Sequence, residues 1–211
     1  MQNTGAARTG LITGSVLMIL TMVLHPAGGS LERILAQTTM IITAHSIAIV
    51  ATVFVTFGLY GMMLSLKSKS GYAVLAFMMA VLSMMAAAIA AAINGLALPF
   101  YLQSYGEEVL AMSDTIRPVL KYGFALNRAM DYIFIGGIVG ATLINCGIIL
   151  RQGVFPKWLA WLGIASCAML FLYLIVDLSI ISLLGFRIFV FSLAAWLCIA
   201  GWMIPTQQQE Q

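Results

Sequence analysis

Arg128 and Asp131 lie three residues apart in the stretch FALNRAMDYIF (residues 124–134), inside a long apolar part of the chain. Residues three apart share one face of a helix, so these two side chains can pair directly. An ionised side chain in hydrocarbon costs about 2.5 kcal/mol or more unless it is paired or hydrated, and such side chains usually mark binding sites or ion pathways. With the adjacent Asn127, this pair is therefore the first candidate for a ligand-binding site. The alternative is an internal ion pair that fixes helix packing.

Other polar side chains are expected at a similar depth. His45 lies about two turns into the second apolar segment, Asn94 near the end of the third, and Asp177 and Arg187 on either side of the last turn. We expect one polar cavity in the outer half of a helix bundle, lined by Arg128, Asp131, Asn127, His45, Asn94, Asp177 and Arg187. For Asp177 and Arg187 the alternative is hydration at the membrane surface.

His25 and His45 are the only histidines, and both are expected at similar depth on consecutive helices. Two such imidazoles can ligate haem b or hold a metal ion, and a redox subunit would use them on haem or quinone. The alternative is that His25 caps a helix end while His45 forms a hydrogen bond across helices. No cofactor is predicted, and haem b is kept as the alternative.

The sequence predicts neither a metal site nor catalysis. The methionines include three adjacent pairs, at residues 62–63, 78–79 and 84–85. Thioethers can bind Cu(I), but adjacent residues point to different faces of a helix, so adaptable packing is the prediction. The three cysteines lie in apolar runs without a CxxC motif, which indicates buried free thiols. No GxSxG, HExxH or Walker sequence occurs, so an enzyme is not expected.

The composition is that of a membrane protein. Of the 211 residues, 62% are hydrophobic and 8% charged, and the mean hydropathy is +1.04, whereas soluble domains carry about 25% charged residues. A membrane crossing takes about 20 apolar residues, so the length fits six crossings and leaves no soluble domain. The basic residues form no stripe, which argues against nucleic acid as a partner.

The expected fold is an all-α polytopic membrane protein, with six transmembrane helices in one bundle and a single domain over residues 1–211. Long apolar runs without alternation favour helices over a barrel, because backbone groups in lipid must be satisfied internally. The first segment is interpreted as an uncleaved helix, and the Ala-rich run 86–95 predicts that the third helix is central. The helices are expected at about 8–25, 39–66, 72–98, 118–150, 155–177 and 182–204.

Short loops rich in Lys and Arg indicate orientation. With both termini inside, five basic residues lie on the inner side and three on the outer side. The second and fourth loops, KSKSG and RQGVFPK, are short and purely basic. Both termini are therefore predicted to be cytoplasmic.

The segment GIILRQGVFPKWLAWLGIASCAMLFLYLI (residues 147–175) joins a helix that ends in a basic residue, a Gly-x-x-Pro turn, and a helix that opens with Leu and Gly. It resembles an uncharacterised family of small multi-pass bacterial membrane proteins, as do RTGLITG and FGLYGMMLSLKSKS. The resemblance implies a bacterial inner-membrane location and carries no activity or site residues.

These observations predict a non-enzymatic protein that binds a small molecule or takes part in transport. One alternative is a structural or accessory membrane subunit, and another is a haem- or quinone-binding redox subunit that uses His25 and His45. The expected partners are membrane lipids and either a second copy of the chain or another membrane subunit.

Overall fold

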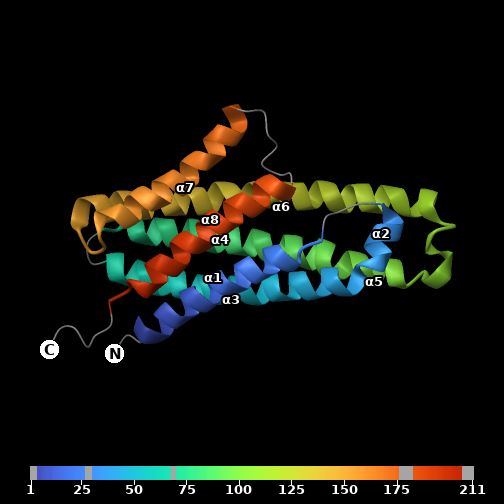
Figure 1. Ribbon diagram of the computed structural model, residues 1–211, viewed down its shortest axis with the longest axis horizontal. Helices are drawn as coiled ribbons and strands as arrows, with labels where there is room; N and C mark the ends of the chain where they lie inside the picture. The colour runs from blue at the N-terminus through green and yellow to red at the C-terminus, as the bar shows by residue number, and fades with distance from the viewer. Residues whose placement is uncertain (1–3, 27–29, 68–69, 176–182, 206–211) are drawn as a thin grey trace.

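The computed structural model describes residues 4–26, 30–67, 70–175 and 183–205, and every regular element in them is helical. The all-α fold class is therefore confirmed. The elements in Figure 1 are α1 (Thr4–Leu24), α2 (Leu31–Ala36), α3 (Thr38–Lys67), α4 (Tyr72–Ala92), the π-helix η1 (Ile93–Ala97), α5 (Leu98–Gln103), the 3₁₀-helix η2 (Gly106–Val109), α6 (Ser113–Gln152), α7 (Lys157–Ile175) and α8 (Leu183–Trp202).

Five helical segments in the described ranges are long and apolar enough to cross a membrane, so the chain is an integral membrane protein. Six crossings were expected, but α7 contributes only a shorter apolar stretch, Lys157–Leu170, among the described residues. The third expected helix is also longer than predicted, because α4, η1 and α5 run on without a break to Gln103. Consecutive long helices alternate in direction, and α1 begins at the end of the bundle where α8 finishes (Figure 1).

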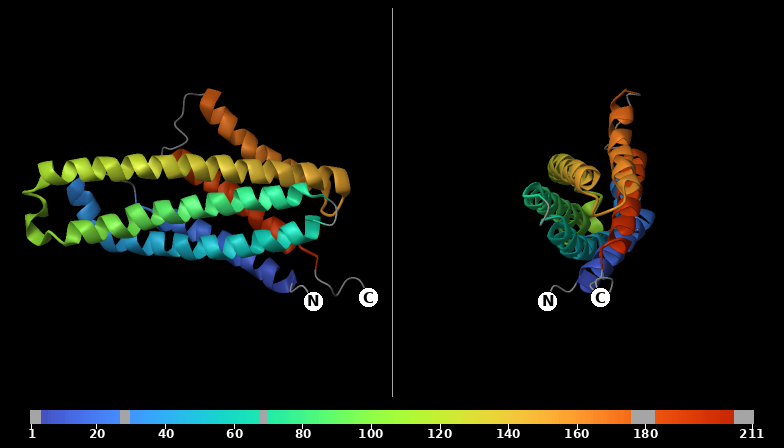
Figure 2. Two further views of the ribbon diagram at one scale, coloured as in Figure 1. Left: turned by 180° about the vertical axis from the view of Figure 1, so that it is seen from behind. Right: turned by 90° about the vertical axis from the view of Figure 1, so that its left-hand side faces the viewer.

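The helices form two layers. Seen end-on in Figure 2, α3, α4 and α6 make one layer, while α1, α8 and α7 make the other. Contacts between α1 and α3 and between α6 and α7 join the layers. The Ala-rich α4 lies between α3 and α6 in its own layer, with Ala73, Ala76 and Ala80 buried. The candidate site lies between the two layers.

Helices α1 and α3 pack with their backbones in close approach. An added Cβ at Gly14 would lie 2.7 Å from the backbone nitrogen of Val55, and one at Gly58 would lie 2.6 Å from the Cα of Leu11. Glycines allow such backbone contact, which supplies packing energy where lipid offers no hydrophobic driving force. The α1–α3 contact therefore depends on the absence of side chains at these positions.

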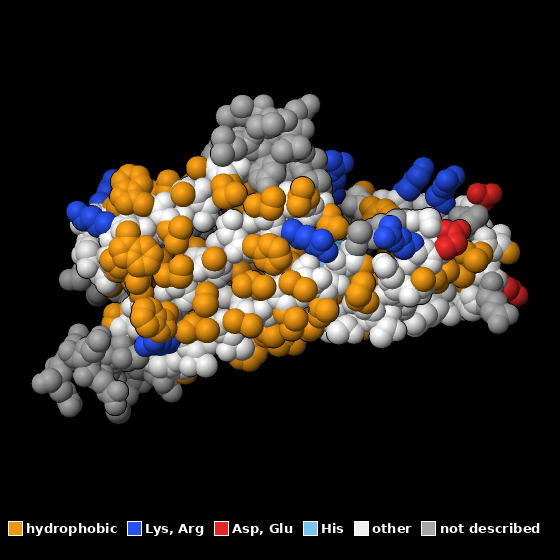
Figure 3. Space-filling model, viewed as in Figure 1, with side chains coloured by type: hydrophobic (Ala, Val, Ile, Leu, Met, Phe, Trp, Pro, Cys, Tyr) orange, Lys and Arg blue, Asp and Glu red, His pale blue; other side chains and the backbone are white. Residues whose placement is uncertain are grey.

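The bundle is longer than a bilayer is thick. At about 1.5 Å per residue, α6 measures about 60 Å, whereas α1 and α8 measure about 30 Å, the thickness of the hydrocarbon layer. Because α1 and α8 lie at the end of the bundle near the termini, the long helices continue past them at the opposite end (Figure 1). In Figure 3 the visible acidic side chains gather at this far end.

The projecting end has its own small core, which forms a cap over the bundle. It consists of the buried apolar side chains of α2, the first turn of α3, α5, η2 and the first turn of α6: Ile34, Ile41, Leu98, Leu102, Val109 and Ile116. The outer loops of the predicted topology are thus packed helical structure.

Candidate functional site

A cavity of about 310 Å³ lies between the two layers, at the level where α1 ends and α8 begins. Its walls come from α1, α3, α4, α6 and α8. On three of these helices the lining side chains follow the one-face spacing of i, i+4, i+7 or i, i+3, i+7. They are Met18, Met22 and His25 on α1 and the residue after it; His45, Ala48 and Thr52 on α3; and Asn127, Asp131 and Phe134 on α6.

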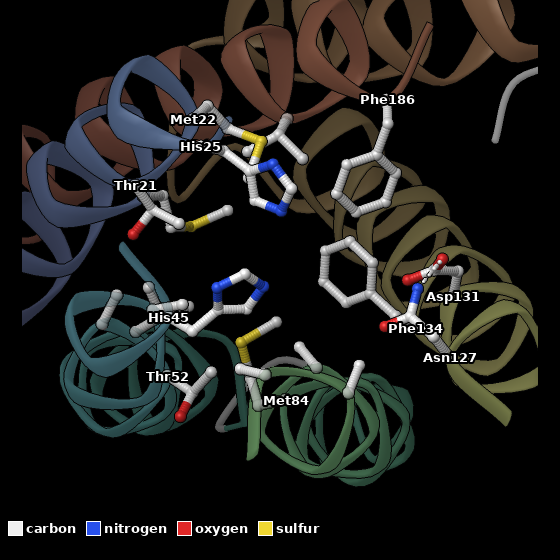
Figure 4. Close-up of a pocket in the computed structure, with 18 of the residues that line it drawn as sticks. Thr21, Met22, His25, His45, Thr52, Met84, Asn127, Asp131, Phe134 and Phe186 are labelled. Carbon is white, nitrogen blue, oxygen red and sulfur yellow. Dashed lines mark hydrogen bonds between the residues drawn. The ribbon is translucent and has the colours of Figure 1, made fainter. Parts of the chain in front are cut away.

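His25 and His45 meet in this cavity. Their ring centroids lie 4.9 Å apart and the ring planes are tilted by 55°. The Nδ1 of His25 is 3.0 Å from the carbonyl oxygen of Pro26, and the Nδ1 of His45 is 2.8 Å from that of Ile41. Figure 4 shows both rings projecting into the cavity. The sequence predicted a similar depth for these histidines but not that they are in contact.

Asn127 and Asp131 form the opposite wall (Figure 4). The Nδ2 of Asn127 donates a hydrogen bond of 2.8 Å to the Oδ2 of Asp131. Arg128, in contrast, is exposed, and no ion pair joins it to Asp131 in the described part of the chain. At about 100° per residue, Asn127 and Arg128 lie on opposite sides of Asp131, about 40° and about 60° away around the helix axis, and the side of Arg128 is exposed. The partner of Asp131 is therefore Asn127.

Arg187 lies beside the cavity and forms a hydrogen bond with the backbone of a residue that lines it. Its Nη2 donates to the carbonyl oxygen of His25, which ties the first turn of α8 to the end of α1. Its Nε is buried and has no acceptor among the described residues. Asp177, which was expected near Arg187, lies outside the described residues.

Asn94 lies next to the cavity rather than in its wall. It sits in η1, and its buried Oδ1 lacks a hydrogen-bond donor within the described ranges. The next residue, Gly95, supports His45, because a Cβ at Gly95 would collide with the Cβ and Cγ of that histidine. A π-helical turn is rare and frequently occurs at functional sites. Here the π-helical turn η1 places Gly95 against the side chain of His45.

The sequence interpretation missed the apolar lining. Phe134 and Phe186 close one side with ring centroids 6.0 Å apart. Three methionines, Met18, Met22 and Met84, also face the cavity. Met18, Met22 and His25 share one helical face, and this i, i+4, i+7 spacing is the sequence signal that indicates their common orientation.

The histidine pair does not suit haem b. Bis-histidine ligation places the two imidazoles on opposite faces of a porphyrin. The two rings are instead in contact with each other, which leaves no room for a porphyrin plane between them.

Comparison with protein-family models, with curated proteins and with solved structures finds no match. The resemblance of residues 147–175 to a bacterial family therefore stays a prediction.

A pair of double-mutant cycles tests the arrangement on α6. For Asn127→Ala with Asp131→Ala, we expect a coupling of about 0.5–1.5 kcal/mol in the free energy of unfolding, because a hydrogen bond is lost. For Arg128→Gln with Asp131→Asn, we expect additivity within about 0.5 kcal/mol, because these side chains share no contact. Reversible unfolding in mixed detergent measures both cycles. Strong coupling in the second cycle would contradict the geometry described above.

Proposed function

We propose that this chain is a membrane protein of a bacterial inner membrane, with six crossings and both termini in the cytoplasm, whose cavity binds a small molecule in a binding or transport-related role. The observation that carries the proposal is the cavity itself. In a chain with few charges, five helices bring two imidazoles, a carboxyl group and a carboxamide to one hollow. Polar side chains at membrane depth are costly and are retained mainly where they serve a function.

The position of the cavity supports access from the side opposite the termini. It lies where the 21 residues of α1 have already spanned about the thickness of the hydrocarbon layer. The polar wall lies on the long helix α6, which continues toward the projecting cap. The apolar lining, including Ala48, Ala51 and Val55, extends toward the termini. Such a mainly apolar hollow with a few placed polar groups is typical of small-molecule sites.

Native mass spectrometry of the protein, released from mild detergent, tests this proposal. We expect a co-purified small molecule on the wild-type chain and at least a tenfold lower occupancy in Ala87→Trp, because Ala87 lines the cavity and the indole would fill it. The matched control is Leu82→Trp on the same helix, where the side chain is 55% exposed on the outer surface.

The outcomes separate the candidate functions. Equal occupancy in both variants would place any bound molecule on the lipid-facing surface and contradict the proposal. An empty wild-type cavity, combined with association of a second membrane protein, would favour the accessory-subunit alternative. A bound quinone would favour the redox alternative.

A further inference from the structure

The hydrogen bonds of His25 and His45 fix the tautomer of each neutral imidazole. A backbone carbonyl oxygen can only accept, so the Nδ1 that faces Pro26 or Ile41 must carry the hydrogen. In each neutral ring, Nε2 is then left with a free lone pair. Histidines that ligate metals almost always donate their other N–H to a carbonyl or carboxylate in this way. The two side chains are thus held in the form in which imidazole binds a metal ion.

The separation of the rings also fits a shared ion. At a metal–nitrogen distance of about 2.0 Å, two imidazoles on one ion have centroids roughly 5 to 6 Å apart. The observed separation of 4.9 Å is close to the lower end of this range. No group among the described residues forms a hydrogen bond with either Nε2. Both lone pairs are therefore without a donor from the described chain, on rings that project into one cavity (Figure 4).

The other side chains around the cavity that could bind a metal ion on the side of the histidines carry soft sulfur donors. Met18, Met22 and Met84 line the same cavity, and in Figure 4 the side chains of Met22 and Met84 project into it together with the two imidazoles. The described residues contain no group of three His, Cys, Asp or Glu side chains that could hold a metal ion. Thioether with imidazole is a donor set that selects Cu(I) rather than ions that prefer oxygen.

The charges around the cavity favour an ion of low charge. Asp131 on the opposite wall can balance one positive charge across the cavity. The guanidinium of Arg187, which is bound to the carbonyl of His25, repels a second positive charge in the cavity.

We propose that His25 and His45, together with the thioethers of Met22 and Met84, form a binding site for Cu(I). This inference rests on the proposed function, because it names the chemical class of ligand for the same cavity. Met18 is one turn from Met22 on the same face and supplies a further thioether.

Competition with a chromophoric Cu(I) chelator, in anaerobic detergent solution with a reductant, measures the affinity of the purified full-length chain. We expect one Cu(I) per chain. The double variant His25→Gln with His45→Gln should bind at least a hundredfold more weakly, and Met84→Leu about tenfold more weakly. The matched control is Met78→Leu on the same helix, whose side chain is 64% exposed, and it should bind like the wild type.

Several results would overturn the inference. Failure of the folded wild type to compete for Cu(I), tighter binding of Zn²⁺ than of Cu(I), or an equal loss in Met78→Leu and Met84→Leu would each do so. If the histidine variants do not fold, X-ray absorption of the copper-loaded wild type decides the question. Both nitrogen and sulfur atoms in the first coordination shell of the copper ion would support the site, and either element alone would contradict it. A cavity that retains another small molecule in native mass spectrometry, while the chain ignores Cu(I), would refute the copper site and leave the proposed function standing.

Discussion

Gly58→Leu is expected to abolish the α1–α3 contact and with it most of the folded protein. An added Cβ at this position would lie 2.6 Å from both the Cα and the backbone nitrogen of Leu11. Backbone atoms cannot rotate away as a side chain can, so the two helices must separate. Overpacking a core usually costs 1–3 kcal/mol, and here we expect more than about 3 kcal/mol because the obstacle is a main chain. The measurement is the yield of monodisperse protein and the unfolding midpoint in mixed detergent.

The control for this prediction is Gly136→Leu in α6. A Cβ at Gly136 would meet no atom within 4 Å, so this substitution adds the same side chain to a helix of the same protein without a collision. Its midpoint should stay close to that of the wild type. Similar losses in both variants would show that glycine is needed for the helices themselves and that the α1–α3 crossing has no special role.

Trp196→Ala is expected to lower the free energy of unfolding by about 3–5 kcal/mol, the range for removing a large buried aromatic side chain. Trp196 on α8 is 1% exposed, and its Nε1 donates a hydrogen bond of 2.9 Å to the carbonyl oxygen of Leu159 on α7. Its indole packs where Gly163 leaves space, since a Cβ there would lie 2.7 Å from Nε1. The substitution therefore removes both a large packed surface and the polar link between α7 and α8.

The matched control is Trp202→Ala, near the end of the same helix. Trp202 is 64% exposed, with the guanidinium carbon of Arg8 5.7 Å from its ring centroid. An exposed cation–π contact contributes about 0.5–1 kcal/mol, so the loss should stay within about 1 kcal/mol. Equal losses at both positions, measured by unfolding in mixed detergent, would mean that Trp196 is not part of a packed core.

Composition and hydropathy along the chain are enough to predict the class of protein and the approximate positions of its long helices. A mean hydropathy of +1.04 with 8% charged residues is typical of a membrane protein and far from the composition of a soluble domain. The expected segments at 39–66 and 182–204 differ from α3 and α8 by no more than two residues at either end. Hydropathy is a local property, so it can be read along the chain without knowledge of the packing. The cap was not predicted as a packed unit, because its short helices are stabilised by the small core they share.

Which side chains meet depends on how the helices pack against one another. In a membrane helix the lipid-facing and inward-facing surfaces are almost equally apolar, so hydrophobic periodicity does not indicate which face is buried. Arg128 was therefore assigned to the site although it points outward, while Met22 and Met84 were left out although they face the cavity. The contact between His25 and His45 follows from the α1–α3 crossing and from the glycine at position 95. These are long-range packing effects, which no local pattern in the sequence encodes.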